Sequence, residues 1–285
     1  MPSTDPFSGK PPHPASSLHY ALHLVPASRR PHAQAWLAWC REVQAIPGAV
    51  HDPGVAGTKL AWWQREVQEA LAGQAHHPVL RSLVQPGPGA PLRAGDFLAV
   101  IEGTRIDLEQ TRYLDAAALA AYLDRAGGGV ATGLVRLLAE DEADAHAMEP
   151  AARSLGHGAL RVRLLRDTGL HARAGRLYLP VAELQRHDVK AHEILRQEAP
   201  WAYGERYLAL MSSQAELAER DIAAPVDALS RAQRRRLGPL AAWGAMHRAL
   251  LDAMRTQDYP VLHQRLALSP LRKLWIATRI GWLGG

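Results

Sequence analysis

The residues best suited to chemistry lie in one segment, Leu164 to Pro180, which reads LLRDTGLHARAGRLYLP. Asp167 and His171 are four residues apart, so a helix would place both on one face. With a third ligand from elsewhere, this pair could bind Zn²⁺ or Fe²⁺, whereas Mg²⁺ prefers oxygen ligands. The alternative, which we favour, is a local Asp–His hydrogen bond that raises the pKa of the histidine.

Five arginines flank this pair and could replace a metal ion, because guanidinium groups bind phosphate oxygens in charge-assisted pairs. Salt bridges to acidic faces of neighbouring helices are an equal alternative for most of them. Arg166 is the one arginine to which we do not apply this alternative. The five are Arg161, Arg163, Arg166, Arg173 and Arg176.

Composition narrows the class of protein. The chain has 285 residues, of which 47% are hydrophobic and 21% charged, as in soluble globular proteins, so disorder and a collagen-like repeat are excluded. The net charge is +5, carried mostly by arginine, which suits polyanionic partners, although an arginine-rich genome would give the same bias. The single cysteine, Cys40, excludes an internal disulfide and is expected in the core. No nucleic-acid-binding motif is present.

The elements that must position these residues are helices. Residues 1–16, with five prolines, predict a flexible tail, and residues 17–285 predict one all-α domain. Gly127 to Gly129 predict a kink or a close approach of backbone to a ligand or helix. Glu140 to Asp144 predict a solvated loop, and Pro150 predicts the start of a helix that runs to Asp167. The other expected helices are 33–46, 55–72, a short one ending at 84, 96–109, and one capped by Asp115.

The chain has no apolar run long enough to cross a membrane, and Met1 to Ser17 lack the order of a secretion signal. We therefore expect a cytoplasmic protein, peripheral at the inner membrane at most. The final segment, 269–283, predicts a helix that either packs on the bundle, which we favour, or lies at a membrane surface. It combines Leu271, Leu274, Trp275, Ile280, Trp282 and Leu283 with Arg272, Lys273 and Arg279.

The Leu164–Pro180 segment resembles the second aspartate-rich segment of the squalene/phytoene synthase family, which reads L-R-D-x-x-x-D-A and then G-R-x-Y-L-P. The resemblance continues in order from Ser17 to Leu283, through Leu60–Trp63 with His77–Leu80, Ile106–Leu108 with Arg112–Tyr113, and Tyr259–Lys273. It implies an isoprenoid-synthase helical bundle with a large central cavity. There, carboxylates paired on two facing helices bind Mg²⁺ and diphosphates, and two prenyl chains join head to head.

The chain departs from the family pattern at the metal-binding positions. Where the family has Arg-Glu-x-Asp-Asp-x-x-Asp, residues 41–48 read REVQAIPG, which places Gln44 and Gly48 at carboxylate positions. His171 replaces the second acid of the later motif, Arg163 an asparagine, and His247 a tyrosine. The resemblance leaves Asp167 as the one metal-ligand candidate, so Mg²⁺ is doubtful here. The candidate diphosphate- and prenyl-binding residues by family position are Ser17, Arg41, Tyr122, Arg163, Arg166, Asp167, His171 and Tyr178.

Two functions follow from the resemblance. The first, which we favour, is a pseudoenzyme that binds a prenyl diphosphate or isoprenoid lipid and serves an accessory role with a protein partner. The chain lacks metal-binding carboxylates of the family pattern, and in this it is similar to the mitochondrial complex I assembly factor of this family. The alternative is an active head-to-head prenyltransferase that converts farnesyl or geranylgeranyl diphosphate into a squalene- or phytoene-type product at an atypical metal site.

Overall fold

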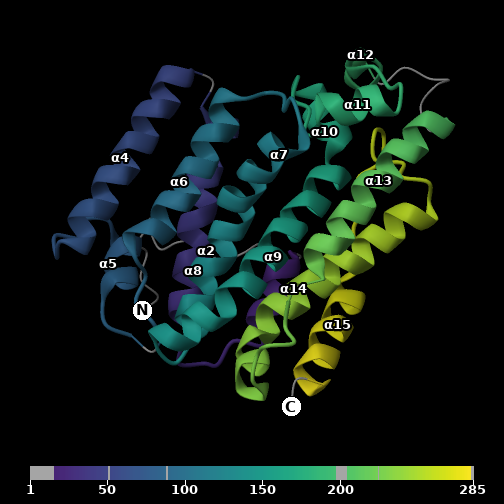
Figure 1. The fold of residues 1–285 in the computed structure, drawn as a ribbon. Coiled ribbons are helices and arrows are strands. Elements are labelled where there is room, and N and C mark those ends of the chain that lie inside the picture. The colour runs from purple at the N-terminus through teal and green to yellow at the C-terminus, as the bar shows by residue number, and fades with distance from the viewer. Residues whose placement is uncertain (1–15, 51, 88, 197–203, 224, 284–285) are drawn as a thin grey trace.

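The chain is described by a computed structural model over residues 16–50, 52–87, 89–196, 204–223 and 225–283, shown as a ribbon in Figure 1. Within these residues every regular secondary-structure element is a helix, and the only β contact is an isolated parallel bridge between Arg112 and Leu177. This confirms the all-α prediction. The predicted tail lies outside the described residues except for Ser16, whose hydroxyl accepts from the His19 amide and caps the first helix.

The described residues form fifteen α-helices and one π-helix. The first half of the chain forms α1 (Ser17–Leu22), α2 (Arg30–Gln44), α3 (Ile46–Ala49), α4 (Pro53–Leu71), α5 (Pro78–Val84), α6 (Ala94–Glu109), α7 (Ala116–Leu123), the π-helix η1 (Asp124–Gly128) and α8 (Gly129–Leu138). The second half forms α9 (Glu142–Arg166), α10 (Thr168–Arg173), α11 (Val181–Arg186), α12 (Ala191–Arg196), α13 (Glu205–Ile222), α14 (Arg231–Thr256) and α15 (Pro270–Leu283). As predicted, the Asp115 carboxylate caps α7.

Helix α9 lies in the middle of the bundle and packs against α8, α13, α14 and η1 (Figure 1). It begins at Glu142, so the predicted start at Pro150 was wrong. The helix begins earlier because the Asp141 carboxylate caps it by accepting from the Asp144 amide, and Pro150 lies inside it. The predicted solvated loop was also partly wrong, since Asp144 is buried and pairs with Arg236 at 3.2 Å.

The consecutive glycines lie where α9 crosses η1 and α8. A Cβ at Gly127 would lie 2.5 Å from the carbonyl oxygen of Gly156, and a Cβ at Gly156 would lie 2.3 Å from the carbonyl oxygen of Gly127. Only glycine permits this separation of the two backbones. The predicted close approach to a neighbouring helix is confirmed, and it brings α9 directly against the C-terminal end of η1.

Aromatic residues of α2 and α6 fill the core between these two helices. Trp36 and Trp39 stack with ring centroids 5.3 Å apart, and Phe97 of α6 meets both rings edge to face. Cys40 is buried beside them, and burial raises the pKa of its thiol. This confirms the prediction that Cys40 is a core residue. The packing fixes the C-terminal end of α2, and with it Gln44.

Helix α15 packs on α14 and α1, as predicted, through a face that buries Ile276 and Ala277. Its opposite face is exposed. In the part of the chain that the structure describes, no helix combines the length and the apolar character that crossing a bilayer requires.

Candidate functional site

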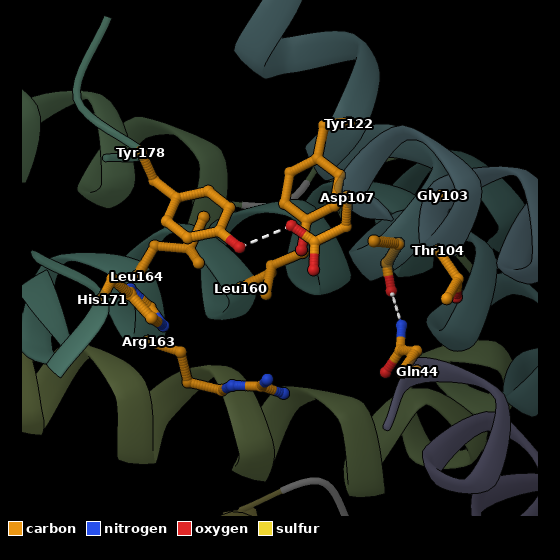
Figure 2. Close-up of a pocket in the computed structure, with 11 residues that line it drawn as sticks. Gln44, Gly103, Thr104, Asp107, Tyr122, Leu160, Arg163, Leu164, His171 and Tyr178 are labelled. Atoms are coloured by element: carbon orange, nitrogen blue, oxygen red, sulfur yellow. Dashed lines mark hydrogen bonds between the residues drawn. The ribbon is translucent and has the colours of Figure 1, made fainter. Parts of the chain in front are cut away.

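A pocket of about 120 Å³ lies between the helices, where α2, α6, α7, η1, α9 and α10 converge. The resemblance predicts the substrate cavity at this position, but this volume is smaller than the large cavity expected and smaller than the roughly 300–1,000 Å³ of most ligand sites. Figure 2 shows its walls. They are formed by Gln44, Gly103, Thr104, Asp107, Tyr122, Ala126, Leu160, Arg163, Leu164, His171 and Tyr178.

One wall carries a hydrogen-bonded group centred on Asp107 of α6. The Tyr178 hydroxyl donates to Asp107 Oδ1 at 2.5 Å, and Arg176 pairs with the same oxygen at 3.1 Å. Arg176 also donates to the Tyr178 hydroxyl at 3.2 Å. Burial, with the negative charge of Asp107, raises the pKa of Tyr178, so the phenol stays protonated. Arg176 therefore has the structural role that the sequence left open.

Three tyrosines stack beside this group and close the pocket on one side. The rings of Tyr113, Tyr122 and Tyr178 lie 5.5 to 5.7 Å apart, centroid to centroid. Leu160 and Leu164 of α9 belong to the same apolar cluster. The cluster fills the space next to the polar pocket. The open space that remains has the size of a ligand's head group.

Gln44 closes the opposite side of the pocket from the C-terminal end of α2. Its amide nitrogen donates to the carbonyl oxygen of Ala126 in η1 at 2.7 Å (Figure 2). The resemblance places a metal-binding carboxylate at this position. The side chain that is present is neutral, and its donor group is already bound to backbone.

Arg163 of α9 extends its guanidinium group into the pocket, across from Asp107 and Tyr122 (Figure 2). Among the described residues its side chain forms neither an ion pair nor a hydrogen bond, and it is exposed to the open space of the pocket although the helices around the pocket hold it deep in the bundle. Burial lowers its pKa, and Tyr122 opposes that shift. Arg163 is therefore the cation available to an anionic ligand. The sequence analysis named both Arg163 and Arg166 as candidates and singled out Arg166.

Arg166 instead binds Asp167. Its guanidinium donates to both carboxylate oxygens, and Arg265 donates to Oδ1 at 2.8 Å. Burial raises the pKa of Asp167, but the two arginines outweigh burial and lower it to about 2. The carboxylate is ionised but its oxygens are held by two cations, which leaves it poorly placed to bind a metal.

His171 lines the pocket, and its ring meets Tyr178 at 4.7 Å between centroids. The predicted Asp167–His171 hydrogen bond that raises the histidine pKa was wrong. Burial lowers the pKa of His171 to about 4, against the opposing charge of Asp167, and its Nδ1 has no hydrogen-bond partner in the described structure. The hydrogen bond is absent because the Asp167 carboxylate faces Arg166 and Arg265. The imidazole is neutral at pH 7 because burial lowers its pKa.

The donor atoms around the pocket do not fit the Mg²⁺ cluster that the resemblance implies. Within the described ranges, no group of three or more His, Cys, Asp or Glu side chains could hold a metal ion. Gln44 offers an amide, His171 an imidazole, and the Asp167 oxygens are paired with arginines. Hard cations of this kind need several free oxygen ligands. In the part of the chain that the structure describes, no third ligand for Zn²⁺ or Fe²⁺ joins Asp167 and His171 either.

The pocket brings together half of the predicted site residues. Tyr122, Arg163, His171 and Tyr178 line it, and Arg166 with Asp167 forms an ion pair next to it. Ser17, the first residue of α1, and Arg41, on the exposed side of α2, do not line it. His247 of α14 is buried, with its Nδ1 hydrogen bonded to the Trp243 carbonyl.

The sequence analysis missed Asp107 as a site residue. The signal was present, because Asp107 lies four residues after Gly103 and three after Thr104, on the face of α6 that turns inward. An acid at that spacing on a partly buried helix needs a partner. The partner, Tyr178, is 71 residues away, so only the fold reveals it.

Comparison with known proteins identifies relatives along most of the chain. The family model for squalene/phytoene synthase matches residues 12–272. Phytoene synthase 2 of Zea mays is 26% identical over 263 residues, which cover 91% of this chain but only 64% of the maize protein. The 15-cis-phytoene synthase of Synechococcus elongatus is 26% identical over 279 residues, covering 91% of this chain and 86% of that protein.

A solved structure supports the architecture. A dehydrosqualene synthase in complex with a ligand superposes with a TM-score of 0.79 and 22% identity, covering 94% of this chain and 91% of that one. At this identity the likeness shows the fold alone. It confirms the predicted isoprenoid-synthase bundle.

Proposed function

Because the chain belongs to the squalene/phytoene synthase family, we propose that it is a catalytically degenerate member that binds the head group of one prenyl diphosphate or isoprenoid lipid in an accessory role. The observation that carries the proposal is the pair of groups facing the pocket: the neutral amide of Gln44 and the unpaired cation of Arg163. An arginine can bind a diphosphate without Mg²⁺.

Binding and catalysis separate at this site. Release of a diphosphate needs its developing charge neutralised, and each 1.36 kcal/mol of lost stabilisation costs about a factor of ten in rate. One guanidinium group at Arg163 supplies attraction, but a single positive charge neutralises only part of the charge that develops on a leaving diphosphate. The arrangement therefore favours holding an anion over ionising it.

The pocket volume supports one ligand in place of two. At about 120 Å³ it suits a head group, and the tyrosine cluster with Leu160 and Leu164 fills the space beside it. A single prenyl chain could enter by displacing part of this cluster. Joining two chains would require a much larger opening.

The accessory role is the kind found in the complex I assembly factor of this family, and it calls for a partner protein or a membrane surface. We place that contact on residues 269–283, where α15 exposes apolar side chains.

The second candidate function is an active head-to-head prenyltransferase. The similarity to phytoene synthases over 91% of the chain favours it, as does the retention of Tyr122 and Tyr178 at the pocket. On this alternative, acids outside the family motifs, such as Asp107, would have to serve as ligands.

Turnover separates the two functions. The protein is incubated with farnesyl or geranylgeranyl diphosphate, NADPH, and Mg²⁺ or Mn²⁺, in parallel with an active family member. Diphosphate release and hydrocarbon product are both measured. We expect neither from this chain. Release with a C30 or C40 product would replace the proposal with the alternative.

Binding is tested by calorimetry with farnesyl diphosphate in the absence of divalent metal. We expect Arg163→Gln to weaken binding about 10- to 100-fold, since a charged hydrogen bond contributes roughly 1.5–3 kcal/mol. The matched control is Arg220→Gln, on the exposed side of α13, which should bind like the parent. Equal affinity in all three proteins, or no binding at all, would remove Arg163 from the site. An isoprenoid in a lipid extract of the purified protein would support the proposal independently.

A further inference from the structure

Helix α15 has two apolar faces, of which the described residues cover only one. Ile276 and Ala277 are buried against the bundle. On the opposite side Leu271, Trp275 and Trp282 are 78%, 60% and 84% exposed, and Leu274 is 49% exposed. We call these four residues the outer face. They stand at positions i, i+3, i+4 and i+11, so the helix places them on one side.

Arginines flank this outer face, and acidic residues are absent from it. Arg272 and Arg279 are exposed, and the Arg279 guanidinium lies 5.3 Å from the ring centroid of Trp275. Neither arginine forms an ion pair among the residues that the structure describes. The last acidic residue of the sequence is Asp258, so α15 and the segment before it carry only positive charge.

We propose that α15 lies flat on an anionic membrane surface, with its outer face at the boundary between head groups and acyl chains. Tryptophan is enriched at that depth, because its ring is apolar and its N–H remains hydrated. Arg272 and Arg279 would bind lipid phosphates at the same level. The inference deepens the accessory role proposed above, and it rests on that role only for its biological setting.

Charge decides between a lipid surface and other occupants of the outer face. Exposed apolar groups of this size usually mark a contact surface. A second copy of α15 would place its own arginines against these arginines, which costs energy. A negatively charged lipid surface matches both the tryptophans and the cations, and the net charge of +5 adds long-range attraction.

The test is flotation of the full chain with vesicles. Vesicles of phosphatidylcholine alone are compared with vesicles of mixed phosphatidylcholine and phosphatidylglycerol. We expect binding to the mixed vesicles only, weakened by salt. Trp275→Ser/Trp282→Ser should abolish it, and Arg272→Gln/Arg279→Gln should weaken it about thirtyfold. Lipids brominated on their acyl chains should quench the parent fluorescence more than that of the tryptophan variant.

Matched control variants lie on α4, on the far side of the bundle in Figure 1. Val55→Ser removes an exposed apolar side chain, and Lys59→Gln/Arg65→Gln removes two exposed cations. Both should bind vesicles like the parent. Arg163→Gln should also float while losing farnesyl diphosphate binding, so a failure of the pocket proposal and a failure of this one give different results.

Three outcomes would overturn the inference. The parent could fail to float with mixed vesicles, or the tryptophan variant could float as well as the parent. The third outcome comes from sedimentation velocity. If the parent is a dimer, if Trp275→Ser/Trp282→Ser is a monomer, and if neither protein binds vesicles, the outer face is a contact between two copies of the chain. Since the substituted side chains are exposed, circular dichroism should show the parent fold in every variant.

Discussion

The side-chain amide of Gln44 donates a hydrogen bond of 2.7 Å to the carbonyl oxygen of Ala126. This bond ties the end of α2 to the π-helix η1, across the pocket that α9 also lines. Family resemblance places a metal-binding carboxylate at this position. In this chain the neutral amide of Gln44 instead links two walls of the pocket by a hydrogen bond.

Restoring the missing acids should create a Mg²⁺ site. We expect Gln44→Asp/Gly48→Asp/His171→Asp to bind Mg²⁺, measured by calorimetry and by a rise in the melting temperature. At a Mg²⁺ concentration one hundred times the Kd, the gain in the free energy of unfolding is about 2.7 kcal/mol. The change at Gly48 is sterically open, since a Cβ there meets no atom within 4 Å.

The control for this variant is Gln44→Asn/Gly48→Asn/His171→Asn, which matches its size without its charge and should not respond to Mg²⁺. Mg²⁺-dependent diphosphate release by the aspartate variant alone would strengthen the degenerate-site proposal. An equal stabilisation of the parent by Mg²⁺ would show that the parent already has a metal site.

The ion pair of Asp167 with Arg166 and Arg265 should contribute to stability above pH 4. The two arginines lower the folded pKa of Asp167 from 3.8 to about 2, so the contribution is complete above 3.8 and is lost as the pH falls toward 2. Asp167→Asn should lower the free energy of unfolding by about 2 kcal/mol at neutral pH. Urea unfolding at several pH values measures it. Asp227→Asn, at an exposed position, is the control. An equal loss of unfolding free energy in this control would contradict the prediction.

The sequence predicted the helices better than their ends. Periodic apolar residues and caps placed α2, α4, α6 and α7 nearly as observed, because each has a local start or stop signal. The start of α9 was misplaced by eight residues, since Pro150 was interpreted as a first-turn proline. The true cap is Asp141, and the pairing of Asp144 with Arg236 that fixes this end is 92 residues apart in the sequence.

The site was harder to predict because its chemistry depends on long-range pairs. Spacing placed Asp167 and His171 on one helix face, but Arg265, from 98 residues away, decides where the carboxylate points. The same holds for Asp107 and Tyr178. Local sequence also could not show which arginine faces the pocket, since Arg163 and Arg166 are one turn apart.

Stability should fall as the pH drops from 6.5 to 4, because the half-buried His171 and the buried His247 resist protonation. Burial lowers the folded pKa of both His171 and His247 to about 4, so below pH 6.5 the unfolded chain binds protons that the folded chain does not. Each histidine costs about 3 kcal/mol by pH 4. His247→Gln should remove about half of this histidine-linked pH dependence. Chemical unfolding across this range measures it.

The comparison uses the change with pH, because replacing the buried His247 also removes its hydrogen bond to Trp243 and lowers stability at every pH. His146→Gln, at an exposed position of α9, is the control and should keep the parent profile. A parent-like slope in His247→Gln would mean that this histidine is protonated in the folded protein.

Gly127→Ala should destabilise the bundle where η1 crosses α9. The new Cβ would lie 2.5 Å from the Gly156 carbonyl oxygen and 2.9 Å from Cβ of Leu160, so the helices must separate. Overpacking of this kind costs about 1–3 kcal/mol. The control is Gly57→Ala in α4, where no atom lies within 4 Å and alanine favours the helix by ~1 kcal/mol. Thermal and urea unfolding should therefore shift in opposite directions for the two variants, and a shift in the same direction would contradict the close crossing on which the pocket wall depends.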